Sequence, residues 1–280
     1  MNNIDQYAVF GHPISHSKSP RIQQLFAQQT GQSLEYNAQD VSPAQFDANA
    51  QAFFAADGKG LNCTVPLKEL AWAYADQLSE RARLAKAVNT LAKQADGGIL
   101  GDNTDGVGLV TDLITNHHIS LTGKRLLILG AGGASRGIIG PLLDCLPDGL
   151  LIVNRTIAKA DEIAAEFAEL GNVSSCEYAA LAGQRFDLII NATSASLNAE
   201  LPPLTDGLLA ENGSCYDLAY GNRPTAFVGW GRRQQAANSL DGLGMLVEQA
   251  AEAFFIWRGI RPHTTEIIAL LNAERQFHAN

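Results

Sequence analysis

The fold is decided by the stretch Leu126-Leu127-Ile128-Leu129-Gly130-Ala131-Gly132-Gly133-Ala134-Ser135, in which an apolar run ends in a glycine-rich turn. An apolar strand that turns on glycines into a helix directs backbone N–H groups and the positive end of the helix dipole towards a phosphate. Ser135 replaces the third glycine of the usual G-x-G-x-x-G pattern. The glycines alone therefore leave open a tight loop or an unrelated phosphate site.

A second apolar run favours a dinucleotide at this turn. The run Leu150 to Val153 ends in Asn154-Arg155-Thr156, where folds that hold NAD usually place an Asp or Glu that accepts from the ribose 2′-hydroxyl. This chain offers amide, guanidinium and hydroxyl donors instead, with Lys159 one helical turn further on. These groups suit a 2′-phosphate, so the spacing predicts a site for NADP.

The chain is expected to be an α/β protein of two domains, because it has 280 residues and a domain usually has about 150. Apolar runs alternate with helical patterns on both sides of the glycine-rich turn, which predicts βαβ crossovers and a parallel, Rossmann-type sheet. The expected strands are Tyr7–Phe10, Leu34–Asn37 and Gly60–Val65 in the first unit, and Leu126–Leu129, Leu150–Val153, Asp187–Asn191 and Cys215–Leu218 in the second.

These patterns also suggest domain limits. We expect a substrate-binding and catalytic α/β domain over residues 1–105, and a linker helix with the dinucleotide-binding domain over residues 106–244. Residues 245–280 are expected to pack back on the first domain, because Met245 to Trp257 is strongly apolar. Two such domains leave a cleft between them, where ligands tend to bind.

Composition excludes several classes of partner. The net charge is −9 and no basic tract occurs, which disfavours nucleic acid. No apolar stretch approaches the roughly 20 residues that span a bilayer, and the first residues lack the parts of a secretory signal. The cysteines are far apart, which predicts free thiols in a reducing cytoplasm and no metal site. They are Cys63, Cys145, Cys176 and Cys215.

Several polar residues lie where loops are expected to meet strands. They are Ser15, Ser17, Ser19, Asn62, Thr64, Lys68, Asn89, Asp102, Asp105 and Gln249. Taken together and without Asp102, these hydroxyls, amides, one lysine and one aspartate are suited to binding a small polyhydroxylated carboxylate and to moving a proton from one hydroxyl.

Each of these residues also has a structural explanation. Ser17 or Ser19 can cap the helix that follows Pro20, and Asn62 and Asn89 can satisfy loop backbone. A single lysine is by default a surface residue, and Gln249 is as readily a surface residue of a helix as a ligand. The Asp102 and Asp105 pair resembles an Asx-turn, in which Asp102 is mainly structural.

In the order and spacing of these segments, the chain closely resembles the NADP-linked shikimate dehydrogenase family. The matching motifs occur in family order over nearly the whole chain. They are Gly11-x-Pro13-Ile14-x-His16-Ser17-x-Ser19-Pro20, Asn62-x-Thr64-x-Pro66-x-Lys68, Ala87-Val88-Asn89-Thr90, Gly101 to Gly106, Gly130 to Ala134, Asn154-Arg155-Thr156, Asn191-Ala192-Thr193-Ser194 and Asp241 to Val247. Departures include Lys159, where Arg is frequent, and Ser196-Leu197, where the family often has small residues or a glycine-containing sequence.

The resemblance implies a role for individual residues. Lys68 is implied as the acid/base residue, with Asp105 beside it. Contacts to shikimate are implied for Ser15, Ser17, Thr64, Lys68, Asn89, Asp105, Tyr220 and Gln249. Cofactor contacts are implied for Gly130, Ala131, Gly132, Gly133 and Ala134 at the pyrophosphate, for Asn154, Arg155, Thr156 and Lys159 at the 2′-phosphate, for Leu218, Gly242 and Met245 at the nicotinamide, and for Glu80 near the cofactor.

The implied activity is the reversible reduction of 3-dehydroshikimate to shikimate by NADPH in aromatic amino-acid biosynthesis, by a monomer or homodimer. One alternative is an NAD-linked quinate/shikimate dehydrogenase, which typically has an acidic residue at the ribose position where this chain has Arg155. Another is a non-catalytic NADP-binding regulator, which would be expected to have lost Lys68 or Asp105.

Overall fold

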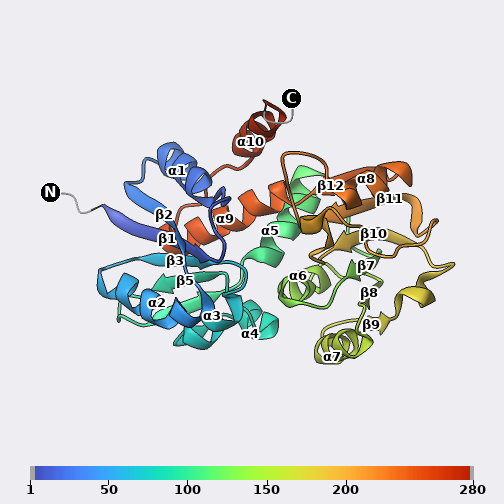
Figure 1. Cartoon of the computed structure of the whole chain (residues 1–280), viewed down its shortest axis with the longest axis horizontal. Coiled ribbons are helices and arrows are strands. Elements are labelled where there is room, and N and C mark those ends of the chain that lie inside the picture. The colour runs from blue at the N-terminus through green and yellow to red at the C-terminus, as the bar shows by residue number, and fades with distance from the viewer. Residues whose placement is uncertain (1–3, 278–280) are drawn as a thin grey trace.

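The computed structural model describes residues 4–277 and contains two six-stranded sheets, each with its own helices (Figure 1). The first sheet has the order β2-β1-β3-β5-β6-β4. Its strands are β1 Asp5–Gly11, β2 Leu34–Asp40, β3 Gly60–Cys63, β4 Gln77–Leu78, β5 Thr90–Lys93 and β6 Ile99–Asp102. Strands β2, β1 and β3 are parallel, whereas β5 runs antiparallel to both of its neighbours.

The second sheet is parallel throughout, in the order β12-β11-β10-β7-β8-β9. This is the strand order of a Rossmann-type fold. Its strands are β7 Arg125–Leu129, β8 Gly149–Val153, β9 Val173–Cys176, β10 Phe186–Asn191, β11 Leu209–Asp217 and β12 Asn238–Asp241. The central strand β7 is apolar and fully buried from Leu126 to Leu129, because helices cover both faces of the sheet.

Helices connect and cover the strands. They are α1 Ser19–Thr30, α2 Phe46–Ala55, α3 Lys68–Tyr74, α4 Glu80–Ala85, α5 Asp105–Thr111, α6 Gly133–Leu143, α7 Ile157–Phe167, α8 Ala226–Arg233, α9 Leu243–Arg258 and α10 Thr265–Phe277. Between residues 4 and 277, no helix is both long and apolar enough to cross a membrane.

Two of these helices lie between the sheets in Figure 1. Helix α5 leaves the first sheet and continues through a π-helical turn at Asp112–Asn116 towards β7. Helix α9 starts beside the second sheet and packs Val247 and Phe254 against Ile22 and Phe26 of α1. The chain thus returns to the first unit after completing the second.

The α/β fold class and the Rossmann-type sheet are confirmed, but several strand predictions need correction. The predicted strand over residues 60–65 ends at Cys63, and the one predicted at residues 215–218 starts earlier, at Leu209, and ends at Asp217. The strands that the sequence did not predict are β4, β5, β6, β9 and β12. The domain limits stay a prediction, and their outermost residues, 1–3 and 278–280, lie outside the described part of the chain.

Candidate active site

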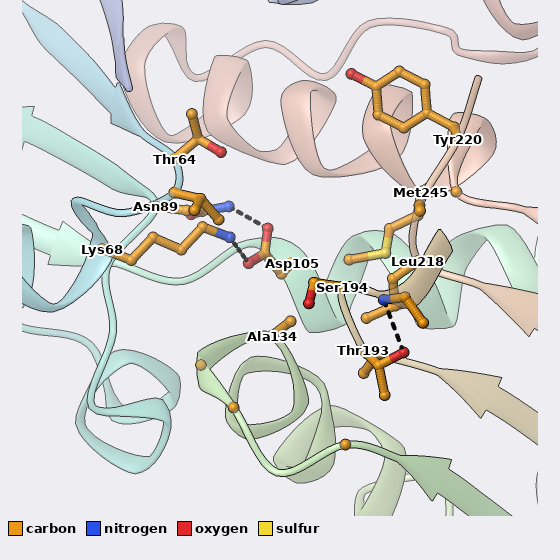
Figure 2. Close-up of a pocket in the computed structure, with 18 of the residues that line it drawn as sticks. Thr64, Lys68, Asn89, Asp105, Ala134, Thr193, Ser194, Leu218, Tyr220 and Met245 are labelled. Atoms are coloured by element: carbon orange, nitrogen blue, oxygen red, sulfur yellow. Dashed lines mark hydrogen bonds and ion pairs between the residues drawn. The ribbon is translucent and has the colours of Figure 1, made fainter. Parts of the chain in front are cut away.

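A cavity of about 1210 Å³ lies between the two units, at the carboxyl ends of β1 and β3 in the first sheet and of the parallel strands of the second. Ligands of open α/β sheets bind at this edge. Figure 2 shows residues of the first sheet on one side of the cavity, facing Leu218, Met245 and Tyr220 on the other. The cavity therefore collects residues that are far apart in the sequence.

Lys68 and Asp105 meet inside this cavity. Lys68 is the first residue of α3 and Asp105 is the first residue of α5, and the Nζ and Oδ2 atoms lie 2.6 Å apart (Figure 2). The two side chains are only 20% and 10% exposed, so solvent screens this ion pair less than a surface pair. An ammonium held by a carboxylate in a partly closed cavity can donate a proton to a bound oxygen.

Asn89 holds the other oxygen of Asp105. Its Nδ2 donates to Asp105 Oδ1 at 2.8 Å and to Thr104 Oγ1 at 2.9 Å, with Gln249 Oε1 at 3.3 Å. Its Oδ1 accepts from the Thr104 backbone N–H at 2.9 Å. Because the amide has only two N–H groups, the longest contact, to Gln249, is the one that a ligand can displace most easily.

The three serines after β1 lie differently. Ser17 and Ser19 line the cavity, together with Thr64 and Tyr220, whereas Ser15 is exposed and is not among the lining residues. Lys18 is the N-cap residue of α1 and makes no side-chain cap bond, whereas the Ser17 hydroxyl accepts from the backbone N–H of Ser19, the first residue of the helix, at 3.3 Å. Ser19 is not among the substrate contacts that the resemblance implies, yet it lies in the same lining as Ser17.

The remaining polar candidates of the first unit have structural partners. Asn62 lines the cavity but accepts from the Tyr36 hydroxyl at 2.6 Å and donates to Asn89 O at 3.0 Å. Asp102 accepts two hydrogen bonds from Arg81, at 2.6 and 2.8 Å.

Tyr220 lies across the cavity from the residues of the first sheet (Figure 2). Burial raises the pKa of its phenol, and the nearby charge of Asp241 adds to the effect, so the phenol stays neutral.

The glycine-rich turn forms a loop between β7 and α6 that lines the cavity. Gly130 has a φ of +106°, a conformation that L side chains rarely adopt. Ser135 is fully buried, and its hydroxyl donates to Gly130 O at 2.7 Å, which closes the turn without a third glycine. The first N–H groups of α6 have no partners within the helix, so the loop formed by Gly130, Ala131, Gly132, Gly133 and Ala134 suits a pyrophosphate.

The loop after β8 supplies positive charge to the same cavity. Asn154, Arg155, Thr156 and Lys159 all line it, and the Arg155 and Lys159 side chains are exposed. Among the described lining residues the only carboxylates are Asp105 and Glu200, and neither lies on this loop. This donor set fits a phosphate on the ribose 2′-oxygen.

The other cofactor candidates separate into two groups. Leu218, Gly242 and Met245 line the cavity beyond Asp105 as seen in Figure 2, which labels two of them. Glu80 is the first residue of α4, is exposed, and is not among the lining residues. The contacts predicted for Ser15 and Glu80 stay predictions, as do those of the residues that line the cavity.

A buried carboxylate that the sequence analysis missed organises the loops after β10 and β11. Asp217 is fully buried and accepts from Asn191 Nδ2 at 3.0 Å, Ser196 Oγ at 2.5 Å and Thr225 Oγ1 at 2.6 Å. Burial raises its pKa, against the effect of these donors. Ser196, which departs from the family pattern, thus has a defined partner. In the sequence, Asp217 has no motif neighbours that would mark it.

The fold and the site together define a two-domain α/β dehydrogenase with a Rossmann-type cofactor unit. Family models match three parts of the chain: a shikimate dehydrogenase substrate binding domain over residues 9–91, a shikimate / quinate 5-dehydrogenase over residues 112–199, and a shikimate 5′-dehydrogenase C-terminal domain over residues 242–271. The chain belongs to the shikimate dehydrogenase family.

Individual relatives agree with this assignment. The shikimate dehydrogenase (NADP(+)) of Methylococcus capsulatus is 60% identical over 276 residues, which cover 99% of each chain. The crystal structure of an Ael1 enzyme from Pseudomonas putida, 48% identical, has a TM-score of 0.88 over 95% of this chain and 98% of that one. Shikimate 5-dehydrogenase from Thermus thermophilus in complex with NADP(H) and shikimate is 30% identical, with a TM-score of 0.84 over 95% of this chain and 97% of that one.

Proposed function

We propose that the protein catalyses the reversible, NADPH-dependent reduction of 3-dehydroshikimate to shikimate. The observation that carries the proposal is the 2.6 Å contact of Lys68 and Asp105 inside the cavity that the phosphate-binding loop also lines. A non-catalytic regulator has no need for such a pair in the cavity. Membership of the shikimate dehydrogenase family supplies the substrate.

NADPH, when bound, supplies the hydride that adds to the C3 carbonyl carbon of the substrate. The carbonyl oxygen gains negative charge as that bond forms, and the Lys68 ammonium stabilises this charge and donates the proton that completes the hydroxyl. Asp105 aims the ammonium, because its Oδ2 lies 2.6 Å from Nζ. Asn89 keeps Asp105 in place through the opposite oxygen.

The surrounding polar residues bind the rest of the substrate. Ser17 and Thr64 donate to the carboxylate and ring hydroxyls, and Ser19 lies beside Ser17 on the same lining. Gln249 and Tyr220 bind ring hydroxyls from the side of α9 and β11. The 2′-phosphate of the cofactor is held by Asn154, Arg155, Thr156 and Lys159, and this assignment favours NADP over the NAD-linked quinate/shikimate alternative.

The proposal is tested by following absorbance at 340 nm with the purified protein. We expect reduction of NADP when shikimate is added, and a much slower reaction with quinate and NAD. A faster reaction with quinate and NAD would support the alternative dehydrogenase. No reaction with either pair, from protein that binds NADP, would contradict the proposal and favour a regulator.

The cellular setting follows from the same proposal. We propose a step in chorismate and aromatic amino-acid biosynthesis, which is the place that the family resemblance implies. All four cysteines are free thiols, which suits a reducing cytoplasm. The oligomeric state, monomer or homodimer, stays a prediction.

A further inference from the structure

The hydroxyl of Tyr216 joins three elements at the edge of the cavity. Tyr216 lies near the end of β11 and is fully buried. Its hydroxyl donates to Asp112 Oδ2 at 2.6 Å, and it accepts from the backbone N–H of Met245 at 3.2 Å. The contact therefore links β11, the π-helical turn after α5, and the first turn of α9. We call it the Tyr216–Asp112 link.

The link satisfies one backbone N–H group at the start of α9 that the helix itself cannot satisfy. The first N–H groups of a helix cannot bond within that helix, and Met245 is the third residue of α9. The Tyr216 hydroxyl provides the missing acceptor from a different element. Asp112 is itself fully buried and orients this hydroxyl, while its other oxygen accepts from Asn116 Nδ2 at 2.9 Å.

Glycine makes this close approach possible. A Cβ atom added to Gly244 would lie 2.0 Å from Asp112 Oδ1 and 2.4 Å from its Cγ. No side chain fits there, because real Cβ contacts essentially never fall below 3.0 Å. The carboxylate of Asp112 thus lies directly against the backbone of α9, one residue before Met245.

The linked elements carry residues of the active site. Asp105 begins the same helical segment that reaches Asp112, and Met245 and Gln249 lie on α9. Leu218 follows Tyr216 by two residues, and both Leu218 and Met245 line the cavity. A shift of this link would therefore move the residues of the nicotinamide side relative to the Lys68–Asp105 pair.

We propose that Tyr216 and Asp112 are positioning residues for hydride transfer, which fix Met245 and Leu218 against the reacting ring of the cofactor. This inference rests on the proposed function, because that function assigns the nicotinamide to this side of the cavity. Neither residue is among those that line the cavity, so both act through Met245 and Leu218.

The test uses Tyr216→Phe, which removes one oxygen atom and keeps the ring. Tyr7→Phe is the matched control, because Tyr7 is buried and its hydroxyl accepts from Arg258 at 3.3 Å outside the active-site cavity. Two quantities are measured for each protein. They are the single-turnover rate of NADPH oxidation by 3-dehydroshikimate, and the Kd of 2′,5′-ADP, which contains only the adenosine half of the cofactor.

We expect Tyr216→Phe to lower the single-turnover rate by about 10- to 100-fold, the scale of a small misplacement of reacting groups. The Kd of 2′,5′-ADP should stay within about twofold of the parent, since distant sites are nearly independent. Asp112→Asn should give the same pattern, because it keeps the size of the side chain but removes the carboxylate that orients the Tyr216 hydroxyl, and it replaces Tyr216→Phe if that variant does not fold. Tyr7→Phe should leave both quantities unchanged.

A single-turnover rate for Tyr216→Phe within twofold of Tyr7→Phe would overturn the proposal, in an otherwise active parent protein. An equal loss of 2′,5′-ADP binding would also overturn it, because it would reveal general damage to the cofactor unit. A parent protein without turnover would overturn the proposed function, and this inference with it.

Discussion

Asp105 is held from two sides, by Lys68 on one oxygen and by Asn89 on the other. Two charge-assisted hydrogen bonds of this kind restrict the carboxylate more than one would, since each prefers its own direction. The Lys68 ammonium is therefore oriented in the cavity by protein groups and not by solvent. At the scale of single residues, this preorganisation is what the proposed chemistry requires.

We propose that cofactor choice also depends on single residues. We expect Arg155→Asp to lower the ratio of kcat/KM for NADP over NAD by at least about 10- to 100-fold, because a charge-assisted hydrogen bond contributes roughly 1.5–3 kcal/mol. The new carboxylate repels a 2′-phosphate and accepts from a free 2′-hydroxyl. Initial rates at 340 nm with both cofactors give the ratio.

Lys159→Gln is the matched control for this change. It removes one positive charge from the same loop but adds no carboxylate, so use of NADP should fall while use of NAD stays level. An unchanged ratio in Arg155→Asp would show that Arg155 does not discriminate between the cofactors.

Residues of the site differ in how far the sequence could place them. Glycine spacing and the donors after the second apolar run follow directly from local chemistry, so the cofactor loops were predictable. Lys68 and Asp105 are separated by 37 positions, and only the family resemblance suggested that they act together. The loop of Ser15, Ser17 and Ser19 has no periodicity to indicate which hydroxyls face inward.

At the scale of elements, close helix packing fixes α9 against α5. A Cβ atom on Gly108 would lie 2.7 Å from both Gln249 Cβ and Gln249 N, and 2.9 Å from Met245 O. The two helices therefore meet backbone to backbone, next to residues that line the cavity. Position 108 therefore requires glycine, because a Cβ atom has no room there.

We expect Gly108→Ala to lower the free energy of unfolding by about 1–3 kcal/mol, because backbone atoms of α9 must move to admit the methyl group. Its KM for the substrate should rise as Gln249 shifts. Gly140→Ala in α6 is the control, because its Cβ would meet atoms at 3.7 and 3.9 Å, and it should gain up to about 1 kcal/mol from helix propensity.

Urea unfolding of the two variants gives the free energies of unfolding, and initial rates at varied shikimate concentration give KM. Equal stability changes in Gly108→Ala and Gly140→Ala would contradict this account of the α5–α9 contact.

In the second sheet, strand prediction succeeded for strands that are buried on both faces. The cores of β7, β8 and β10 are long apolar runs, because helices cover both faces of the parallel sheet. Strands β9 and β12 are the two edges of that sheet, and their sequences, VSSC and NSLD, show neither an apolar run nor alternation. These two strands join the sheet through backbone pairing with the adjacent strand, so their own residues carry no pattern that predicts a strand.

At the scale of the whole molecule, a buried ion network attaches the returning helix α9 to the first unit. Arg81 of α4 bonds both oxygens of Asp102 and also Glu252 of α9, at 2.9 Å. The two carboxylates are 9% and 10% exposed. The network joins segments that are 171 positions apart.

We expect Arg81→Ala to lower the free energy of unfolding by about 3–5 kcal/mol, because the buried Asp102 carboxylate loses its paired cation, whereas Glu252 keeps its ion pair with Arg261. Arg21→Ala is the control, since its pair with Glu274 is 45% and 37% exposed and should contribute at most about 1 kcal/mol. Denaturant midpoints for the two variants give the comparison, and a similar small loss in both would refute a structural role for the network.

The most direct test of the whole account is the kcat of Lys68→Ala for shikimate oxidation with NADP. Lys59→Ala is the matched control, because Lys59 is paired with Asp57 at 2.9 Å on the exposed surface. We expect kcat to fall by about 10²- to 10⁴-fold in Lys68→Ala, with a much smaller change in KM, as for a lost general acid/base. A kcat for Lys68→Ala equal to that of Lys59→Ala would contradict the assignment of the proton transfer to Lys68.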